Sequence, residues 1–595
     1  MRSRTTWTLT LSTGVMVAAV LSGTGCRKTP AHESAPASSA SAVTTPESVR
    51  GALATLSSAK AGEAPRLFNM AAYLPAQCYA TTKDAAGGKN ARAHNACFAC
   101  HQTSLAPNYA NDEDVQTTLS IARYAADNRW THLSSPPQPI TATDDEILSR
   151  IRKSNYFDDK GQIAAVPDKS WDVDGDGTFG GFTPDCWFHL DAKGFDHAPD
   201  GKASGWRAFA YAPFPGMFWP TNGSAGDVFI RLPAAYRQDK AGQDSSKIYE
   251  INFAILESTI RRVDVPLSEP ADERELGSDL DGDGAMGIAK RVAFVWPPKD
   301  GRVFGYVGAA SALDTKKEGW PAAGLFPRGT EFLHTLRYLD VDDGHVRMSA
   351  RMKEVRYMRK TRWLTYSDLQ LAFEAEAREK GKSPNRLKAI IADPERGAST
   401  GTGWLISGLI ENAEGKLRPQ TVEETAACIG CHGGVGVTTD STFAFARKIP
   451  SGAAYAFRDG WYHWSERGLE GIPEPKRADG KGEYARWLEA VGGGNDFRAN
   501  DEVQTRFFGA NGKPKPEALA ALSRDIATLL VPSAKRALEL DRAYLALVAE
   551  QHFERGRDVM VGSTPKFEKH LEQETPTGIA EPIGPAWLAR ADQAK

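Results

Sequence analysis

Cys97-Phe98-Ala99-Cys100-His101 has a counterpart later in the chain, at Cys428-Ile429-Gly430-Cys431-His432. Both stretches read Cys-x-x-Cys-His, the pattern at which haem is attached covalently to a protein. The spacing follows from the chemistry, because two thiols add to the two vinyl groups of one porphyrin and a two-residue gap lets one turn of chain present both. The next residue, histidine, lies under the iron as its proximal ligand. Four of the seven cysteines fall into these motifs, so the sequence predicts two covalently bound haem c groups.

A zinc site is the main alternative for closely spaced cysteines. Structural zinc takes four protein ligands, and neither motif has a second pair of thiols or imidazoles near it in the sequence. In the two motifs the chain resembles c-type cytochromes, as a di-haem protein of the bacterial lipoprotein type. This resemblance covers about ten residues and selects no particular family. It implies electron transfer, and haem attachment outside the cytoplasm.

The start of the chain reads as an export signal. Arg2 and Arg4 give a positive beginning, and the apolar run Val15–Leu21 follows. This run is too short to span a membrane in the mature protein. The 595 residues allow two to four domains, and the net charge of −3 gives no reason to expect a nucleic-acid partner.

The stretch Leu21-Ser22-Gly23-Thr24-Gly25-Cys26 resembles a bacterial lipoprotein site, which implies a lipid on Cys26. Gly23 departs from the pattern, where a larger apolar residue is usual. Residues 27–48 are rich in Ala, Ser, Thr and Pro, as in a flexible tether. Because Arg27 is not aspartate, the resemblance implies an outer-membrane lipoprotein that faces the periplasm or the cell surface. The alternative is ordinary cleavage and release into the periplasm.

Two cysteines, Cys78 and Cys186, belong to neither haem motif nor the lipid site. In an oxidising compartment such thiols often pair. The sequence therefore predicts a disulfide between Cys78 and Cys186, which would link the first haem segment to the domain that follows.

The fold class that we expect is α+β multidomain, with mainly helical haem-binding segments near both ends and a β-rich middle domain with DxDxDG loops. The expected divisions are a signal peptide (1–25), a lipidated cysteine and flexible linker (26–64), a first haem segment (65–160), a β-rich domain with possible calcium loops (161–366), a second haem segment with C-terminal helices (367–560) and a loosely structured C-terminal tail (561–595).

Local patterns predict several elements. Residues 111–128 show helical spacing of apolar residues, whereas 248–255 and 228–232 read as strands. Residues 332–341 and 345–357 are expected to form a hairpin around Asp342-Asp343-Gly344. Capping boxes at Thr143 and Thr421 predict helix starts, and the second of these leads directly into the second haem motif.

Two acidic loops have the spacing of calcium sites. One contains Asp172, Asp174 and Asp176, and the other contains Asp279, Asp281 and Asp283, each followed by glycine. Alternating carboxylates present hard oxygens to one ion, but a full EF-hand loop also needs glutamate at position twelve. That position holds Thr183 in the first loop and Lys290 in the second. The loops resemble the DxDxDG loops of extracellular calcium proteins, and the alternative is an acidic surface turn.

The sixth iron ligand decides what a haem protein does. His132 is the local candidate for the first haem, and His463, in Trp461-Tyr-His-Trp464, is the local candidate for the second. More distant candidates are His94, His334, Met352, His552 and Met560. Each histidine also has a simpler interpretation, as a hydrogen-bonded core or surface imidazole.

Three function classes follow. The favoured one is an exported electron-transfer protein that exchanges electrons with redox partner proteins or an external donor or acceptor. The second is a di-haem oxidoreductase, similar to di-haem peroxidases or oxygenases, with one open haem. The third is a surface protein that binds a ligand or senses redox state. No catalytic acid, base or arginine marks an open iron in the sequence, which favours electron transfer. Electrons pass efficiently only between haems that lie close together. For this reason we expect the two haem segments to fold together.

Overall fold

The computed structural model describes most of residues 114–579. Within this range it leaves out residues 122, 215–224, 384–388, 434–437, 478, 492–499, 560, 563–566, and outside it describes 66–68, 74–79, 81–82, 93–94, 97–101, 107 and 582. The described residues belong to one compact unit, which spans 50–595. The predicted signal peptide, the lipid site at Cys26 and the linker lie outside the described residues.

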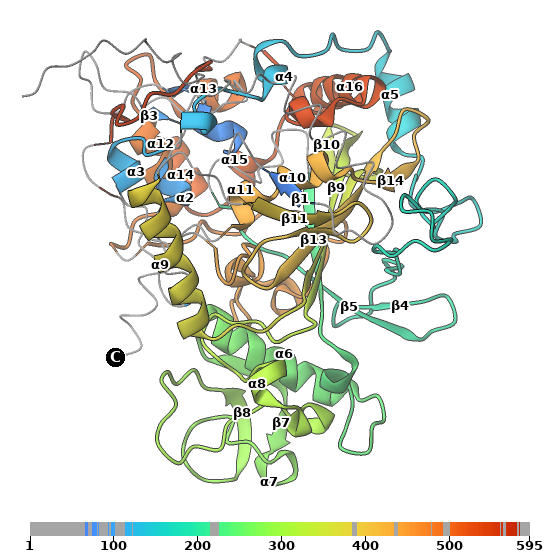
Figure 1. The fold of residues 1–595 in the computed structure, drawn as a ribbon, viewed down its shortest axis with the longest axis vertical. Helices are drawn as coiled ribbons and strands as arrows, with labels where there is room; N and C mark the ends of the chain where they lie inside the picture. The colour runs from blue at the N-terminus through green and yellow to red at the C-terminus, as the bar shows by residue number, and fades with distance from the viewer. Residues whose placement is uncertain are drawn as a thin grey trace, which may run out of the picture. The chain divides into compact units, whose positions relative to one another are not determined.

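A ten-stranded antiparallel sheet organises the fold (Figure 1), in the order β1-β11-β12-β13-β10-β9-β6-β5-β4, with β14 paired to β13. Its strands are β1 (Arg66–Phe68), β4 (Phe195–His197), β5 (Ala203–Phe209), β6 (Ala225–Arg231), β9 (Glu331–Asp342), β10 (His345–Lys360), β11 (Ala389–Asp393), β12 (Gly397–Ser399), β13 (Trp404–Glu411) and β14 (Leu417–Pro419). The α+β class is confirmed.

The predicted hairpin is confirmed as β9–β10. Asp342 pairs with His345, so the connection is the two-residue turn Asp343-Gly344. Both turn residues have positive φ, 48° and 77°. Such a turn matches the right-handed twist of the flanking strands, which is why an Asp-Gly pair predicts it well.

Two predicted helix starts and one predicted strand can be compared with the structure. The capping boxes at Thr143 and Thr421 open α5 (Asp144–Ile151) and α10 (Val422–Ala426), as expected. The predicted strand 248–255 is wrong, because these residues lie in α6 (Ser246–Arg261), which begins at an N-cap, Ser245. Nearly all of α6 is buried, and a continuous apolar run does not distinguish a buried helix from a buried strand.

The predicted helix over 111–128 is also wrong. Of the residues described in this range, only α3 (Asp114–Thr117) is α-helical and η2 (Arg123–Ala125) is a single 3-10 turn. Other main-chain groups of this stretch bond to the C-terminal segment. The Leu119 amide donates to the Thr575 carbonyl at 3.0 Å, and the Leu571 amide donates to the Ala126 carbonyl at 2.8 Å. Residues 567–579 are therefore held against the first haem segment, unlike the loose tail predicted for 561–595.

The sheet also crosses the predicted domain boundaries. β1 comes from the predicted first haem segment, and β11 to β14 lie beyond residue 366, yet β13 pairs with β10 along seven residues from Glu354 to Lys360. The predicted boundary at 366/367 thus separates strands that belong to one sheet.

The other helices and strands are shorter or lie around the sheet. They are η1 (Ala76–Tyr79), β2 (Thr81–Thr82), β3 (Ala93–His94), α2 (Cys97–Cys100), η2 (Arg123–Ala125), α4 (Thr131–Ser134), η4 (Ala234–Arg237), β7 (Val265–Asp272), α7 (Glu273–Leu276), β8 (Ile288–Val292), η5 (Gly308–Ala312), α8 (Thr315–Glu318), α9 (Tyr366–Lys382), α11 (Ile429–His432), η6 (Phe445–Arg447), η7 (Phe457–Gly460), α12 (Glu483–Val491), α13 (Asp501–Phe507), α14 (Pro516–Leu522), α15 (Ala527–Leu530), α16 (Ala534–Glu550) and η8 (Phe553–Arg555). Among the described helices, none has the length and apolar character needed to cross a membrane.

Candidate functional site

Each Cys-x-x-Cys-His motif forms one helical turn. In the first motif, α2, the His101 amide donates to the Cys97 carbonyl at 2.7 Å. In the second, at α11, the His432 amide donates to the Cys428 carbonyl at 3.1 Å. Residues three apart on a helical turn lie on one side of it, so the two thiols of each motif are presented together.

The fold brings the two motifs together, although more than half of the chain separates them. Phe98 belongs to a hydrophobic cluster against which Cys100, Cys428 and Cys431 also pack. Burial raises the pKa of the Cys100 thiol, and the nearby Cys431 thiol raises it too. The proximity of these thiols agrees with the expectation that both segments fold together.

His432 has the surroundings that a proximal iron ligand needs. Its ring lies 5.0 Å from that of Phe443, and its Nδ1 donates to the Ser441 carbonyl at 2.7 Å. Iron-binding histidines commonly donate the other ring N–H to a carbonyl, which fixes the orientation of the ring and directs Nε2 to the metal. Burial lowers the pKa of His432 to about 4, so the ring is neutral near pH 7. The residues at the second motif therefore fit a haem.

The two local candidates for the sixth ligand have contacts of their own. His132 is buried, its Nδ1 donates to the Gly556 carbonyl at 2.9 Å, and its Nε2 lies 3.4 Å from the Glu550 carboxylate. The His463 ring packs against Phe188 and Phe229, with centroid distances of 5.8 and 5.3 Å. These contacts favour the simpler interpretation of both residues, and the sixth ligands stay a prediction.

The predicted Cys78–Cys186 disulfide is wrong, because neither residue forms one. Cys78 lies among the haem-motif thiols. Burial raises the pKa of Cys431 to about 12, and the Cys78 thiol contributes to that rise. Cys186 is buried in another cluster with Tyr156, whose hydroxyl donates to the Cys186 carbonyl at 2.9 Å. The fold thus places the two thiols in different surroundings.

Buried charges lie beside the second motif, and no local sequence signal pointed to them. Glu354 on β10 is 1 % exposed and accepts hydrogen bonds from Arg356 and Arg557, both at 2.9 Å. Burial lowers the pKa values of the two guanidinium groups, but attraction to Glu354 outweighs it and raises both, with a contribution from Cys428. The second motif therefore packs against a buried cluster of charged groups.

Glu354 should make stability depend on acid pH. Burial raises its pKa, but attraction to Arg356 and Arg557 outweighs this and lowers it from 4.5 to about 2. A carboxylate with a depressed folded-state pKa stabilises the fold above pH 4.5 and loses that contribution as pH falls towards 2. We expect a loss of about 3 kcal/mol from this group across that window. Urea unfolding of wild type and Glu354→Gln over the same pH range checks this, and parallel pH curves for the two proteins would contradict it.

The acidic loops each meet a buried glutamate that the sequence analysis missed. Oxygens of Asp172, Asp174 and Glu395 lie within 4.8 Å of one another, as do those of Asp279, Asp281 and Glu273. Asp176 and Asp283 are outside these two groups. Both glutamates lie outside the twelve-residue loops, where loop spacing gives no signal for them.

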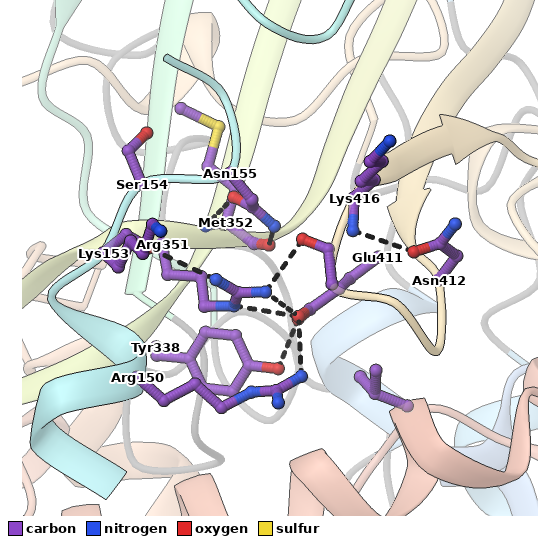
Figure 2. A network of polar contacts seen from close by, with 12 residues as sticks. Arg150, Lys153, Ser154, Asn155, Tyr338, Arg351, Met352, Glu411, Asn412 and Lys416 are labelled. Carbon is purple, nitrogen blue, oxygen red and sulfur yellow. Dashed lines mark hydrogen bonds and ion pairs between the residues drawn. The ribbon is translucent and has the colours of Figure 1, made fainter. Parts of the chain in front are cut away.

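A separate buried network ties α5 to the sheet (Figure 2). Glu411 on β13 is fully buried and accepts from Arg351 Nε and Nη2, at 2.8 and 2.6 Å. The Tyr338 hydroxyl donates to the same carboxylate at 2.6 Å, and Arg150 on α5 lies 3.4 Å away. The Glu411 carboxylate is fully occupied by these hydrogen bonds and ion pairs, so we assign the network a structural role.

A cavity of about 150 Å³ lies beside α6, with Arg207, Glu257 and Trp461 among its lining residues. Ligand pockets usually measure 300 Å³ or more. This cavity gives no support to the ligand-binding alternative.

The comparisons with known proteins point to a lipoprotein family. A family model described as "-like lipoprotein" matches residues 181–524, which is more than half of the chain. The chain belongs to this lipoprotein family. An "Uncharacterized lipoprotein" of Aquifex aeolicus (strain VF5) is 29% identical over 580 residues, which cover 85% of this chain and 90% of that protein. No solved structure matches the lipoprotein.

These matches correct one expectation and confirm part of another. The assignment to the di-haem c-type cytochromes is wrong, because the matching family is a distinct lipoprotein family. The matched residues include the second Cys-x-x-Cys-His motif but begin after the first. Membership of a lipoprotein family supports the predicted export and lipid anchoring at a membrane.

Proposed function

We propose that this lipoprotein carries two covalently attached haems and transfers electrons outside the cytoplasm, anchored to the outer membrane by a lipid on Cys26. Its redox partners would be other proteins or an external donor or acceptor. The observation that carries the proposal is the meeting of two Cys-x-x-Cys-His turns on one hydrophobic cluster. Nothing in local sequence requires two such distant motifs to pack together, whereas electron transfer between two haems requires it.

The residues around the second motif have separable roles in this proposal. Cys428 and Cys431 would hold the porphyrin edge, and His432 would offer Nε2 while the Ser441 carbonyl keeps its ring oriented. Haem, when bound, supplies reversible one-electron chemistry. Cys428, Cys431 and His432 are partly buried, and the two cysteines pack against the hydrophobic cluster. This partial shielding from water would reduce solvent reorganisation when charge moves.

A spectroscopic titration tests the function. We expect the purified lipoprotein to retain haem after denaturation, to show two reversible one-electron steps, and to keep its ferric optical and EPR spectra when peroxide is added. An electron carrier has no need to admit peroxide to its iron. A peroxide-dependent change at one haem would instead favour the di-haem oxidoreductase, and a denatured chain without attached haem would overturn both functions.

A further inference from the structure

The second acidic loop has a buried carboxylate that its sequence pattern lacks. Position twelve of the loop is Lys290, but Glu273 at the start of α7 reaches the loop from the other side. Glu273 is 1 % exposed. Its Oε1 accepts from the Leu280 amide at 2.6 Å, and its Oε2 accepts from the Gly287 amide at 2.8 Å. The loop's own main chain thus fixes this carboxylate over it.

The three carboxylates have the spacing of ligands to one hard cation. Oxygens of Glu273, Asp279 and Asp281 all lie within 4.8 Å of one another. Calcium–oxygen distances are about 2.3–2.6 Å, so oxygens that share one ion lie at most about twice that far apart. All three donors are oxygens, which suit calcium and offer nothing to a soft metal.

One buried oxygen in this group has no hydrogen bond. Asp279 is 3 % exposed, and its Oδ1 accepts from the Gly282 amide at 2.7 Å. Its Oδ2 accepts no hydrogen bond from any described group. A buried carboxylate oxygen without a donor is costly unless a cation satisfies it.

Arg302 forms a long ion pair with Asp279, but it does not supply that hydrogen bond. Its Nε lies 3.6 Å from Asp279 Oδ2, whereas the same Nε donates to the Asp279 carbonyl at 3.1 Å. One guanidinium charge also leaves the loop negative, because Glu273, Asp279, Asp281 and Asp283 carry four carboxylates. The balance suits a divalent cation.

We propose that Glu273, Asp279 and Asp281 bind one calcium ion, with Glu273 taking the part of the missing twelfth-position ligand. The ion would join the start of α7 to the loop that leads into β8, and so fix the end of the β7–β8 pair. The first loop has a similar arrangement with Glu395. Among the described residues, no buried carboxylate oxygen of that group lacks a hydrogen bond as Asp279 Oδ2 does, so the first loop carries no proposal.

Calorimetric titration of the full-length lipoprotein tests the site, after removal of calcium with a chelator and with calcium chloride as titrant. We expect Glu273→Gln to bind one equivalent less than wild type. Glu395→Gln is the matched control, since it removes the corresponding glutamate of the first loop and should keep this equivalent. Circular dichroism checks that each variant is folded.

Asp281→Asn serves if Glu273→Gln fails to fold, because Asp281 is only partly buried. Loss of one equivalent in either folded variant would support the site. Equal binding by wild type and the folded variant, or no binding by wild type, would overturn it. This result is independent of the haem content of the protein.

Discussion

Replacing Cys428 and Cys431 together with alanine is expected to reduce the covalent haem content from two haems per chain to one. Without these thiols no thioether bond can form at the second motif. The first motif should keep its haem, because its own turn from Cys97 to His101 closes through a local hydrogen bond. The haem absorbance of the denatured protein, divided by chain concentration, measures the change.

Cys78→Ala is the matched control for that experiment. Cys78 lies near the same thiols but belongs to neither motif, so its loss should leave two haems attached. Two haems retained in the Cys428/Cys431 double variant would show that the second motif does not attach haem. One haem in the Cys78→Ala variant would show that this cysteine takes part in attachment.

Glu411→Ala is expected to lower the free energy of unfolding by about 3–5 kcal/mol, because it leaves a buried arginine without its counter-ion. Arg351 is 6 % exposed and directs two nitrogens to Glu411, while Tyr338 donates to the same carboxylate. Figure 2 shows that Arg351, Tyr338 and Arg150, from three elements of the fold, converge on the Glu411 carboxylate. Denaturant unfolding followed by circular dichroism measures the effect.

Arg347→Ala is the control, because Arg347 lies in the β9–β10 hairpin that also holds Tyr338 and Arg351. Arg347 pairs with Asp342 at 2.7 Å, but both side chains are more than half exposed. Exposed ion pairs contribute little to stability. We expect a much smaller change than for Glu411→Ala. Equal losses in the free energy of unfolding of the two variants would mean that burial does not make the Glu411 contacts more stabilising than an exposed ion pair.

Elements governed by near neighbours in sequence were predictable. The Asp343-Gly344 turn and the capping boxes at Thr143 and Thr421 depend on residues within one turn of chain. Elements governed by distant contacts were not. Residues 118–128 have helical spacing, yet their main-chain groups bond to residues 569–577, and α6 reads as a strand because it is buried nearly all round.

The same division holds for the candidate sites. By itself, the sequence determined both Cys-x-x-Cys-His motifs and the acidic loops, since each is a spacing within a few residues. Only the tertiary structure decided that Cys100 and Cys431 meet, that Cys78 lies with them rather than with Cys186, and that Glu273 and Glu395 lie beside the acidic loops. The physical reason is that these partners are brought together by burial of the hydrophobic core and pairing of the sheet, and neither leaves a local signature at the partner residue.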